Sequence, residues 1–289
     1  MLTEPEIKGI WIPLITPLNL DDEVDHASFE RFIQRLPLFD IQGLVLNGTT
    51  GESPTIAIHE IVNILETVRK SIGSAPLPLM IGTGTNDTAG TIRRTEQAGL
   101  LGADAALVVV PYYSRPSQAG IIEHYRKVAE VGVPIMVYDI PGRTGVSLTV
   151  DTLRTLFEID GIVGLKDSTG STEMTSKLVS YDAKPILCGE DILFLDALRS
   201  GASGGMAASA NVLAKEFAGI YNLFKSGEHD AAKADFTELI PLINLLFKES
   251  NPAPLKWLLA QKGWISSDRL RLPMLGISEQ LQQELSFYV

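Results

Sequence analysis

Several short apolar runs of the sequence end in residues that could take part in catalysis. Lys166 ends the run Ile162-Val-Gly-Leu, and an ammonium group there is costly to bury unless it is paired or used in chemistry. Burial would lower its pKa and supply the free amine that attacks a ketone. The alternative is a structural lysine that ends the strand and pairs with Asp167. Taken by itself, the position of Lys166 leaves both interpretations open.

Other candidate groups follow other apolar runs. Thr49 and Thr50 lie in a glycine-flanked turn, where hydroxyl and backbone N–H groups could bind a carboxylate or simply lead into a helix. Tyr138 could transfer a proton, or could pack with its hydroxyl satisfied locally. Arg143 could hold a carboxylate through two hydrogen bonds, or could lie on a solvated loop.

The elements that must position these groups are strands and helices in alternation. Continuous apolar runs are typical of parallel strands that are covered on both faces, and the sequence has eight of them, at 9–17, 43–51, 78–85, 105–113, 134–141, 162–168, 185–190 and 204–208. Amphipathic helix patterns lie between them, for example at 28–38, 56–71, 88–101, 118–130 and 150–157. This alternation predicts an α/β fold, a (β/α)8 TIM barrel, whose catalytic groups lie at the carboxyl ends of the strands. The eighth strand has the weakest signal, because Gly201-Ala-Ser-Gly-Gly has few side chains.

After Asn211 the pattern contains helices only. Apolar residues spaced for one buried helix face are Phe236, Leu239, Ile240, Ile243, Leu246 and Phe247. Pro252 and Pro254 mark a loop between two of these helices. We therefore expect a barrel at residues 1–211 and a helical extension, packed on the barrel, at residues 212–289.

Composition excludes several classes of function. The 289 residues carry a formal charge of -11, which repels phosphate backbones and anionic lipid, so we expect no nucleic-acid partner. No segment reaches the ~20 apolar residues of a membrane span, and the first residues do not resemble an export signal. Cys188 is the single cysteine and cannot form an internal disulfide. A soluble protein of the reducing cytoplasm is expected.

Cofactor and metal chemistry find little support in the sequence. The four histidines lie away from the predicted strand ends and have no metal-ligand spacing, so we expect no metal. The segment Gly82-Thr-Gly-Thr-Asn-Asp87 lacks the third glycine of a dinucleotide fingerprint, and we expect no cofactor. Glu190 and Asp191 could suggest acid–base chemistry, but their position before Ile192 favours capping of the next helix.

Five motifs in order along the chain resemble those of the dihydrodipicolinate synthase family, within the N-acetylneuraminate lyase superfamily of class I aldolases. They are Gly48-Thr-Thr-Gly-Glu52, Pro111-Tyr-Tyr-Ser-Arg-Pro-Ser-Gln118, Tyr138-Asp-Ile-Pro-Gly-Arg-Thr-Gly145, Gly164-Leu-Lys-Asp167, and Asn251-Pro-Ala-Pro-Leu-Lys256 with Leu270-Arg-Leu-Pro-Met274. The resemblance implies a lyase of lysine and diaminopimelate biosynthesis, in which pyruvate forms a Schiff base with Lys166. The resulting enamine then attacks the aldehyde of L-aspartate-4-semialdehyde.

The resemblance also implies the roles of the site residues. Tyr138, Thr49 and Tyr113 match a proton relay, with Tyr113 reaching in from a neighbouring subunit of a homotetramer or homodimer. Thr50 matches a contact to the pyruvate carboxylate, and Arg143 matches the residue that receives the carboxylate of the second substrate. Two further residues, Gly189 and Met206, match positions that line the pyruvate pocket.

The chain departs from the family pattern at Asp139, where asparagine is usual, and at the glycine-rich eighth strand. The positions matching the lysine-inhibition pocket of some members are Ser53, Pro54, Ile58, Ile61, Asn86, Gly90 and Tyr112. Because Ile58, Ile61 and Gly90 supply no charge for the amines of lysine, we hypothesise weak or no inhibition by L-lysine.

Two competing functions remain. One is another aldolase of the superfamily that acts on a sialic acid or a 2-keto-3-deoxy sugar acid. Arg143 disfavours it, since the sugar lyases generally lack arginine at this position. The other is a non-catalytic barrel that binds the ligand as a sensor, which would have no need of a proton relay.

Overall fold

The computed structural model describes residues 1–36, 41–73, 77–181 and 183–289. In these residues eight strands form a closed barrel in sequence order, from β1 to β8, and the predicted fold class is confirmed. The strands are β1 Gly9–Pro13, β2 Gly43–Leu46, β3 Leu79–Gly82, β4 Ala105–Val109, β5 Ile135–Asp139, β6 Ile162–Asp167, β7 Ile186–Cys188 and β8 Gly204–Met206.

The helices follow the strands as the amphipathic patterns predict. Their bounds are α1 His26–Ile33, α2 Ile58–Ile72, α3 Thr88–Leu100, α4 Gln118–Ala129, α5 Pro141–Thr144, α6 Val150–Phe157, α7 Glu173–Val179, α8 Phe194–Arg199, α9 Ala210–Lys225, α10 His229–Leu246, α11 Ala253–Gln261 and α12 Glu279–Leu285. The predicted helix at 28–38 corresponds to α1, and its positions 37 and 38 lie outside the described residues. Side chains cap the start of α3, α4 and α6, where Asp87, Ser117 and Thr149 each accept a backbone N–H of the first turn and so satisfy a donor that the helix leaves without a partner.

Each strand begins at its predicted first residue or one residue later, and ends one to five residues before its predicted end. The residues after the observed ends form the loops that carry half of the eight candidate residues, namely Thr49, Thr50, Tyr113 and Gly189. The predicted ranges include the residues that follow each strand, where strand pairing has stopped, and for this reason they overestimate strand length.

The short strand β8 owes its glycines to the close approach of β1. Gly204 pairs with Gly9, and a Cβ atom at Gly204 would lie only 2.5 Å from the backbone nitrogen of Gly9. A side chain at this position would force the two strands apart. The departure from a bulkier eighth strand therefore has a steric reason in this chain.

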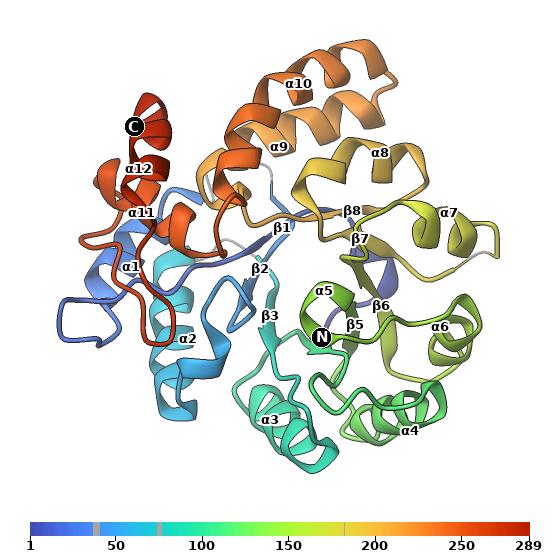
Figure 1. The fold of residues 1–289 in the computed structure, drawn as a ribbon. Coiled ribbons are helices and arrows are strands. Elements are labelled where there is room, and N and C mark those ends of the chain that lie inside the picture. The colour runs from blue at the N-terminus through green and yellow to red at the C-terminus, as the bar shows by residue number, and fades with distance from the viewer. Residues whose placement is uncertain (37–40, 74–76, 182) are drawn as a thin grey trace. The chain divides into compact units, whose positions relative to one another are not determined.

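The chain forms two compact units. The first consists of Met1–Trp11 and Pro78–Ala207, and the second consists of Ile12–Leu77 and Ala208–Val289. In the first unit, α3, α4, α6 and α7 follow one another along the outer side of the strands from β3 to β7 (Figure 1). A core of aliphatic residues from β4 to β7 packs against these helices, and Tyr125 of α4 lies within it. Its hydroxyl donates to the carbonyl oxygen of Val108 at 2.7 Å.

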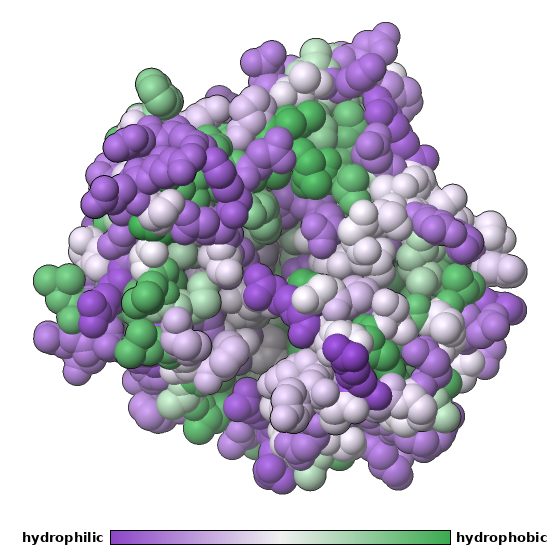
Figure 2. Space-filling model, viewed as in Figure 1, coloured by the Kyte–Doolittle hydropathy of each residue, from purple (hydrophilic) through white to green (hydrophobic). Residues whose placement is uncertain are grey.

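The second unit contains α9 and α10, which lie side by side, and α11 and α12 near the C-terminus (Figure 1). The loop between α11 and α12 exposes Leu272 and Leu275, and Figure 2 shows hydrophobic surface over this loop beside hydrophilic residues. The same loop carries Arg269 and Arg271, which bind other parts of this unit. The division of the chain at residues 211 and 212 stays a prediction.

Across the described ranges, none of the helices combines the length and the apolar character that a membrane span requires.

Candidate active site

Lys166 and Tyr138 lie side by side on neighbouring strands. The two residues are partners in the parallel register of β5 and β6, and both are buried, with 6% and 5% of their surfaces exposed. The Lys166 Nζ atom lies 4.2 Å from the centroid of the Tyr138 ring. The first two candidate catalytic residues are thus brought together by strand pairing.

The Lys166 amine forms no hydrogen bond or ion pair with the residues that the structure describes, and it lies over the face of the Tyr138 ring. The neighbouring carboxylate of Asp167 accepts hydrogen bonds instead from the backbone and hydroxyl of Thr169 and from the hydroxyl of Thr175. The pair between Lys166 and Asp167 that the structural interpretation predicts is therefore not formed. A buried amine without a polar partner is unfavourable for stability and suited to reaction.

Asp139 is a second buried group that is only partly satisfied. Its Oδ2 atom accepts the backbone N–H of Leu148 at 3.2 Å, whereas its Oδ1 atom has no partner among the described residues. Burial raises the pKa of Asp139 to about 6, and the nearby charge of Asp167 adds to the rise. Tyr138, Asp139, Lys166 and Asp167 are named here the β5–β6 cluster.

Gly189 makes room for the Lys166 side chain. It directly follows β7, and a Cβ atom at this position would lie 2.6 Å from Lys166 Cε and closer still to Ser168 Oγ. Only glycine leaves the amine its observed position. Met206, predicted to line the same pocket, is the last residue of β8 and is buried.

Glu190 was predicted to cap the helix that follows it. It does stand at the N-cap position of the 3-10 helix Asp191–Leu193, but in the described structure its side chain makes no capping hydrogen bond. Burial raises the pKa of Glu190, and the positive charges of Lys166 and Arg143 oppose that rise. A half-buried carboxylate thus lies within electrostatic range of both candidate cations.

Arg143 and Tyr113 are both exposed. Arg143 lies in the short helix α5, directly after β5. Tyr113 lies in the loop after β4 with 90% of its surface exposed and a left-handed φ of 72°. Among the described residues of the single chain, Tyr113 forms no hydrogen bond, ion pair or ring contact with the β5–β6 cluster.

Thr49 and Thr50 lie in the loop after β2, which is bounded by two residues in the left-handed region, Asn47 with φ of 55° and Glu52 with φ of 59°. Such a conformation costs a non-glycine residue about 1 kcal/mol or more and persists only where neighbours hold it. Thr50 is buried, and its Oγ1 atom accepts a hydrogen bond from Asn251 Nδ2 at 3.0 Å.

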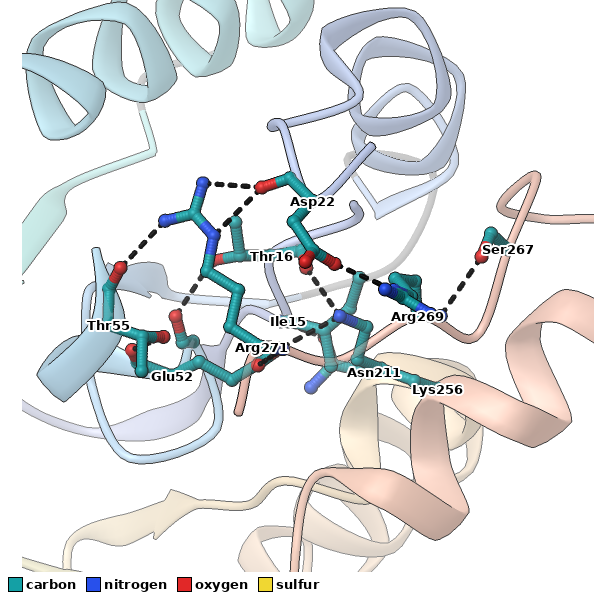
Figure 3. A network of polar contacts seen from close by, with 11 residues as sticks. Ile15, Thr16, Asp22, Glu52, Thr55, Asn211, Lys256, Ser267, Arg269 and Arg271 are labelled. Carbon is teal, nitrogen blue, oxygen red and sulfur yellow. Dashed lines mark hydrogen bonds and ion pairs between the residues drawn. The ribbon is translucent and has the colours of Figure 1, made fainter. Parts of the chain in front are cut away.

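Lys256 holds this loop, and sequence reasoning assigned it no role. It reaches from α11 to Glu52 Oε1 at 2.7 Å and to the carbonyl oxygen of Thr16 at 2.9 Å (Figure 3). The other carboxylate oxygen of Glu52 accepts the backbone N–H of Arg271. Burial lowers the pKa of Lys256, and Glu52 opposes this change. The signal in the sequence is a single lysine within the otherwise apolar run Pro254-Leu-Lys-Trp-Leu-Leu.

Further polar contacts join the C-terminal loop to the same region. The guanidinium group of Arg271 binds the carbonyl oxygens of Asp22 and Thr55 (Figure 3). It also binds the carboxylate of Glu60. Thr16, Glu52, Lys256 and Arg271 are named here the Glu52–Lys256 network.

The histidines and the cysteine show no metal-site arrangement. Within the described ranges, no group of three His, Cys, Asp or Glu side chains is placed to hold a metal ion. Cys188 is buried and free, and burial raises the pKa of its thiol.

Comparison with known proteins identifies the family. The model of the dihydrodipicolinate synthetase family matches residues 6–289. The 4-hydroxy-tetrahydrodipicolinate synthase 2 of Clostridium acetobutylicum is 37% identical over 287 residues, which are 98% of this chain and 100% of that protein. The chloride-inhibited dihydrodipicolinate synthase from Acinetobacter baumannii, solved in complex with pyruvate, has a TM-score of 0.93 and 34% identity, with 97% of each chain covered. A structure described as the first monomeric dihydrodipicolinate synthase variant has a TM-score of 0.94 and 30% identity, covering 98% of this chain and 96% of that one. The chain therefore belongs to the dihydrodipicolinate synthetase family, as its five motifs predict.

Proposed function

We propose that this chain catalyses the reaction of a 4-hydroxy-tetrahydrodipicolinate synthase, the condensation of pyruvate with L-aspartate-4-semialdehyde in lysine and diaminopimelate biosynthesis. The observation that carries the proposal is the Lys166 amine, which is buried, lies over the Tyr138 ring and has its space secured by Gly189. Relatives that match nearly the whole chain carry the name of this synthase, which favours it over a lyase of sugar acids.

The proposed reaction begins at Lys166. Its nitrogen attacks the ketone carbon of pyruvate, and loss of water forms the imine. Removal of a proton from the methyl group gives the enamine, whose carbon attacks the aldehyde of the second substrate. The amine of that substrate then closes the ring on the imine carbon and releases Lys166.

The remaining site residues are assigned as proposals. Tyr138 and Thr49 move protons together with Tyr113, Thr50 binds the pyruvate carboxylate, and Arg143 binds the carboxylate of the aldehyde substrate. The planar guanidinium group of Arg143 is suited to a carboxylate because it donates two parallel hydrogen bonds. Pyruvate would lie against Gly189 and Met206.

A homotetramer or homodimer is also proposed, with Tyr113 reaching the site of a neighbouring subunit. The 90% exposure of Tyr113 supports this placement, because tyrosine is enriched at the interfaces between subunits. We propose the reducing cytoplasm as the compartment, which suits a protein with one free, buried thiol.

Borohydride reduction in the presence of pyruvate tests the chemistry. The hydride converts the imine to a stable secondary amine, so the chain gains the mass of reduced pyruvate at Lys166. An unmodified protein would contradict the proposal. A coupled assay with L-aspartate-4-semialdehyde and with sugar aldehydes then tests the substrate, and activity confined to the sugars would contradict the assignment.

A further inference from the structure

The contact between Asn251 and Thr50 determines which of the two groups donates the hydrogen bond. Asn251 Nδ2 lies 3.0 Å from Thr50 Oγ1, and an amide nitrogen can only donate. The hydroxyl oxygen of Thr50 therefore accepts, and its own proton remains available. In the part of the chain that the structure describes, the Thr50 hydroxyl donates no hydrogen bond, although Thr50 is only 3% exposed.

A buried hydroxyl whose oxygen is occupied and whose proton is unused is prepared to donate to an anion. We propose that Asn251 is a positioning residue for pyruvate, because it holds the Thr50 hydroxyl with its proton directed to the substrate carboxylate. This inference rests on the proposed function, in which Thr50 binds that carboxylate.

The loop that carries Thr50 is held by contacts that do not involve the Thr50 hydroxyl. Lys256 binds Glu52, and the hydroxyl of Thr16 donates to the carbonyl oxygen of Gly51 at 2.9 Å. Lys256 belongs to α11, and Asn251 directly precedes Pro252, the N-cap residue of that helix. The segment from Asn251 to Lys256 thus makes two contacts with one loop: Lys256 holds the side chain of Glu52, and Asn251 orients the hydroxyl of Thr50.

This division of roles predicts which kinetic constant changes. Loss of the Asn251 amide leaves the ion pair and the loop backbone in place but allows the Thr50 hydroxyl to rotate. The carboxylate contact exists both in bound pyruvate and in the transition state, so its loss weakens substrate binding more than the chemical step. We expect the KM for pyruvate to rise roughly tenfold, and kcat to change by less than about twofold.

A double-mutant cycle provides the test. Asn251→Ala, Thr50→Val and the double variant are compared by the KM for pyruvate and by the pyruvate concentration that gives half-maximal borohydride trapping. If Asn251 acts through the hydroxyl, Asn251→Ala raises both values in the natural background and leaves them unchanged in the Thr50→Val background. Asn251→Leu, which has nearly the shape of asparagine but no donor, should behave like Asn251→Ala and keeps the test valid if the alanine variant folds poorly.

Lys248→Ala is the matched control. Lys248 precedes Asn251 by three residues and forms an exposed ion pair with Glu284, so its removal should not change the KM for pyruvate. An equal rise of KM in both Thr50 backgrounds, or no rise in either, would overturn the role of Asn251. A wild-type protein that gives no trapped adduct would instead refute the proposed function itself, and the positioning role with it.

Discussion

Two buried lysines of this chain have opposite surroundings. Lys256 has 0% of its surface exposed and binds a carboxylate and a carbonyl oxygen. Lys166 has 6% exposed and no polar partner among the described residues. Burial by itself therefore does not identify a reactive lysine, because a lysine with polar partners and a lysine without them are buried alike. The absence of a partner separates the candidate nucleophile from the structural residue.

The carboxyl groups beside the two lysines differ in the same way. Both oxygens of Glu52 accept hydrogen bonds, whereas one oxygen of Asp139 has no partner in the described structure. The β5–β6 cluster thus contains buried polar groups that the fold leaves unsatisfied, while the Glu52–Lys256 network satisfies its own. Unsatisfied groups reduce stability and are tolerated where they serve chemistry.

The largest expected effect comes from replacing Lys166. Lys166→Ala should reduce kcat by a factor on the order of 10⁴ or more and abolish borohydride trapping, because the proposed nucleophile is lost. The midpoint of thermal unfolding should change little, since the substitution removes no ion pair or hydrogen bond. The coupled assay and a thermal melt measure both quantities. A variant that keeps its activity but unfolds at a clearly lower temperature than the wild-type protein would show that Lys166 is structural.

Lys256→Met should produce the opposite result, with a loss of stability. Removing one partner of a buried ion pair leaves Glu52 uncompensated and costs about 3–5 kcal/mol. Urea unfolding measures the loss, and Lys248→Met, which breaks the exposed pair with Glu284, should cost less than about 1 kcal/mol. Equal costs for the two variants would show that burial of the Glu52–Lys256 pair is unimportant.

Asp139→Asn should stabilise the protein at neutral and higher pH. The folded-state pKa of about 6 lies above the reference value of 3.8, so the folded state binds more protons between these values. The contribution of Asp139 to stability is fully present below about pH 4 and is lost as the pH rises through 6. The variant avoids this penalty and should be more stable by up to about 3 kcal/mol at pH 8. Urea unfolding of both proteins from pH 4 to 8 gives the difference, and a difference independent of pH would contradict the prediction.

Arg143→Ala should have the smallest effect of the four. Arg143 is exposed, so stability should be unchanged, while the KM for the aldehyde should rise roughly ten- to thirtyfold through loss of a charged hydrogen bond. Arg143→Lys keeps the charge without the planar guanidinium group, so its KM for the aldehyde should lie between those of the wild-type protein and Arg143→Ala. Pyruvate trapping serves as the control and should be unaffected. An unchanged KM for the aldehyde would refute the role given to Arg143.

The sequence by itself determined the barrel, the order of its strands and the family, because continuous apolar runs and motifs are local properties of the chain. It also singled out Lys166 and Tyr138, since each stands at the end of an apolar run. The sequence placed Glu190 correctly at a helix start, but the capping hydrogen bond expected of its side chain is not formed, and burial raises its pKa.

Only the tertiary structure decided which buried groups have partners. Thr50 and Asn251 are 201 residues apart in sequence, and Glu52 and Lys256 are 204 apart. No local pattern encodes such pairs, because they form only when α11 packs against the loop after β2. For the same reason the lone Lys256 in an apolar helix and the lone Lys166 in an apolar strand give similar signals in sequence. The fold supplies a carboxylate to one and leaves the other without a partner.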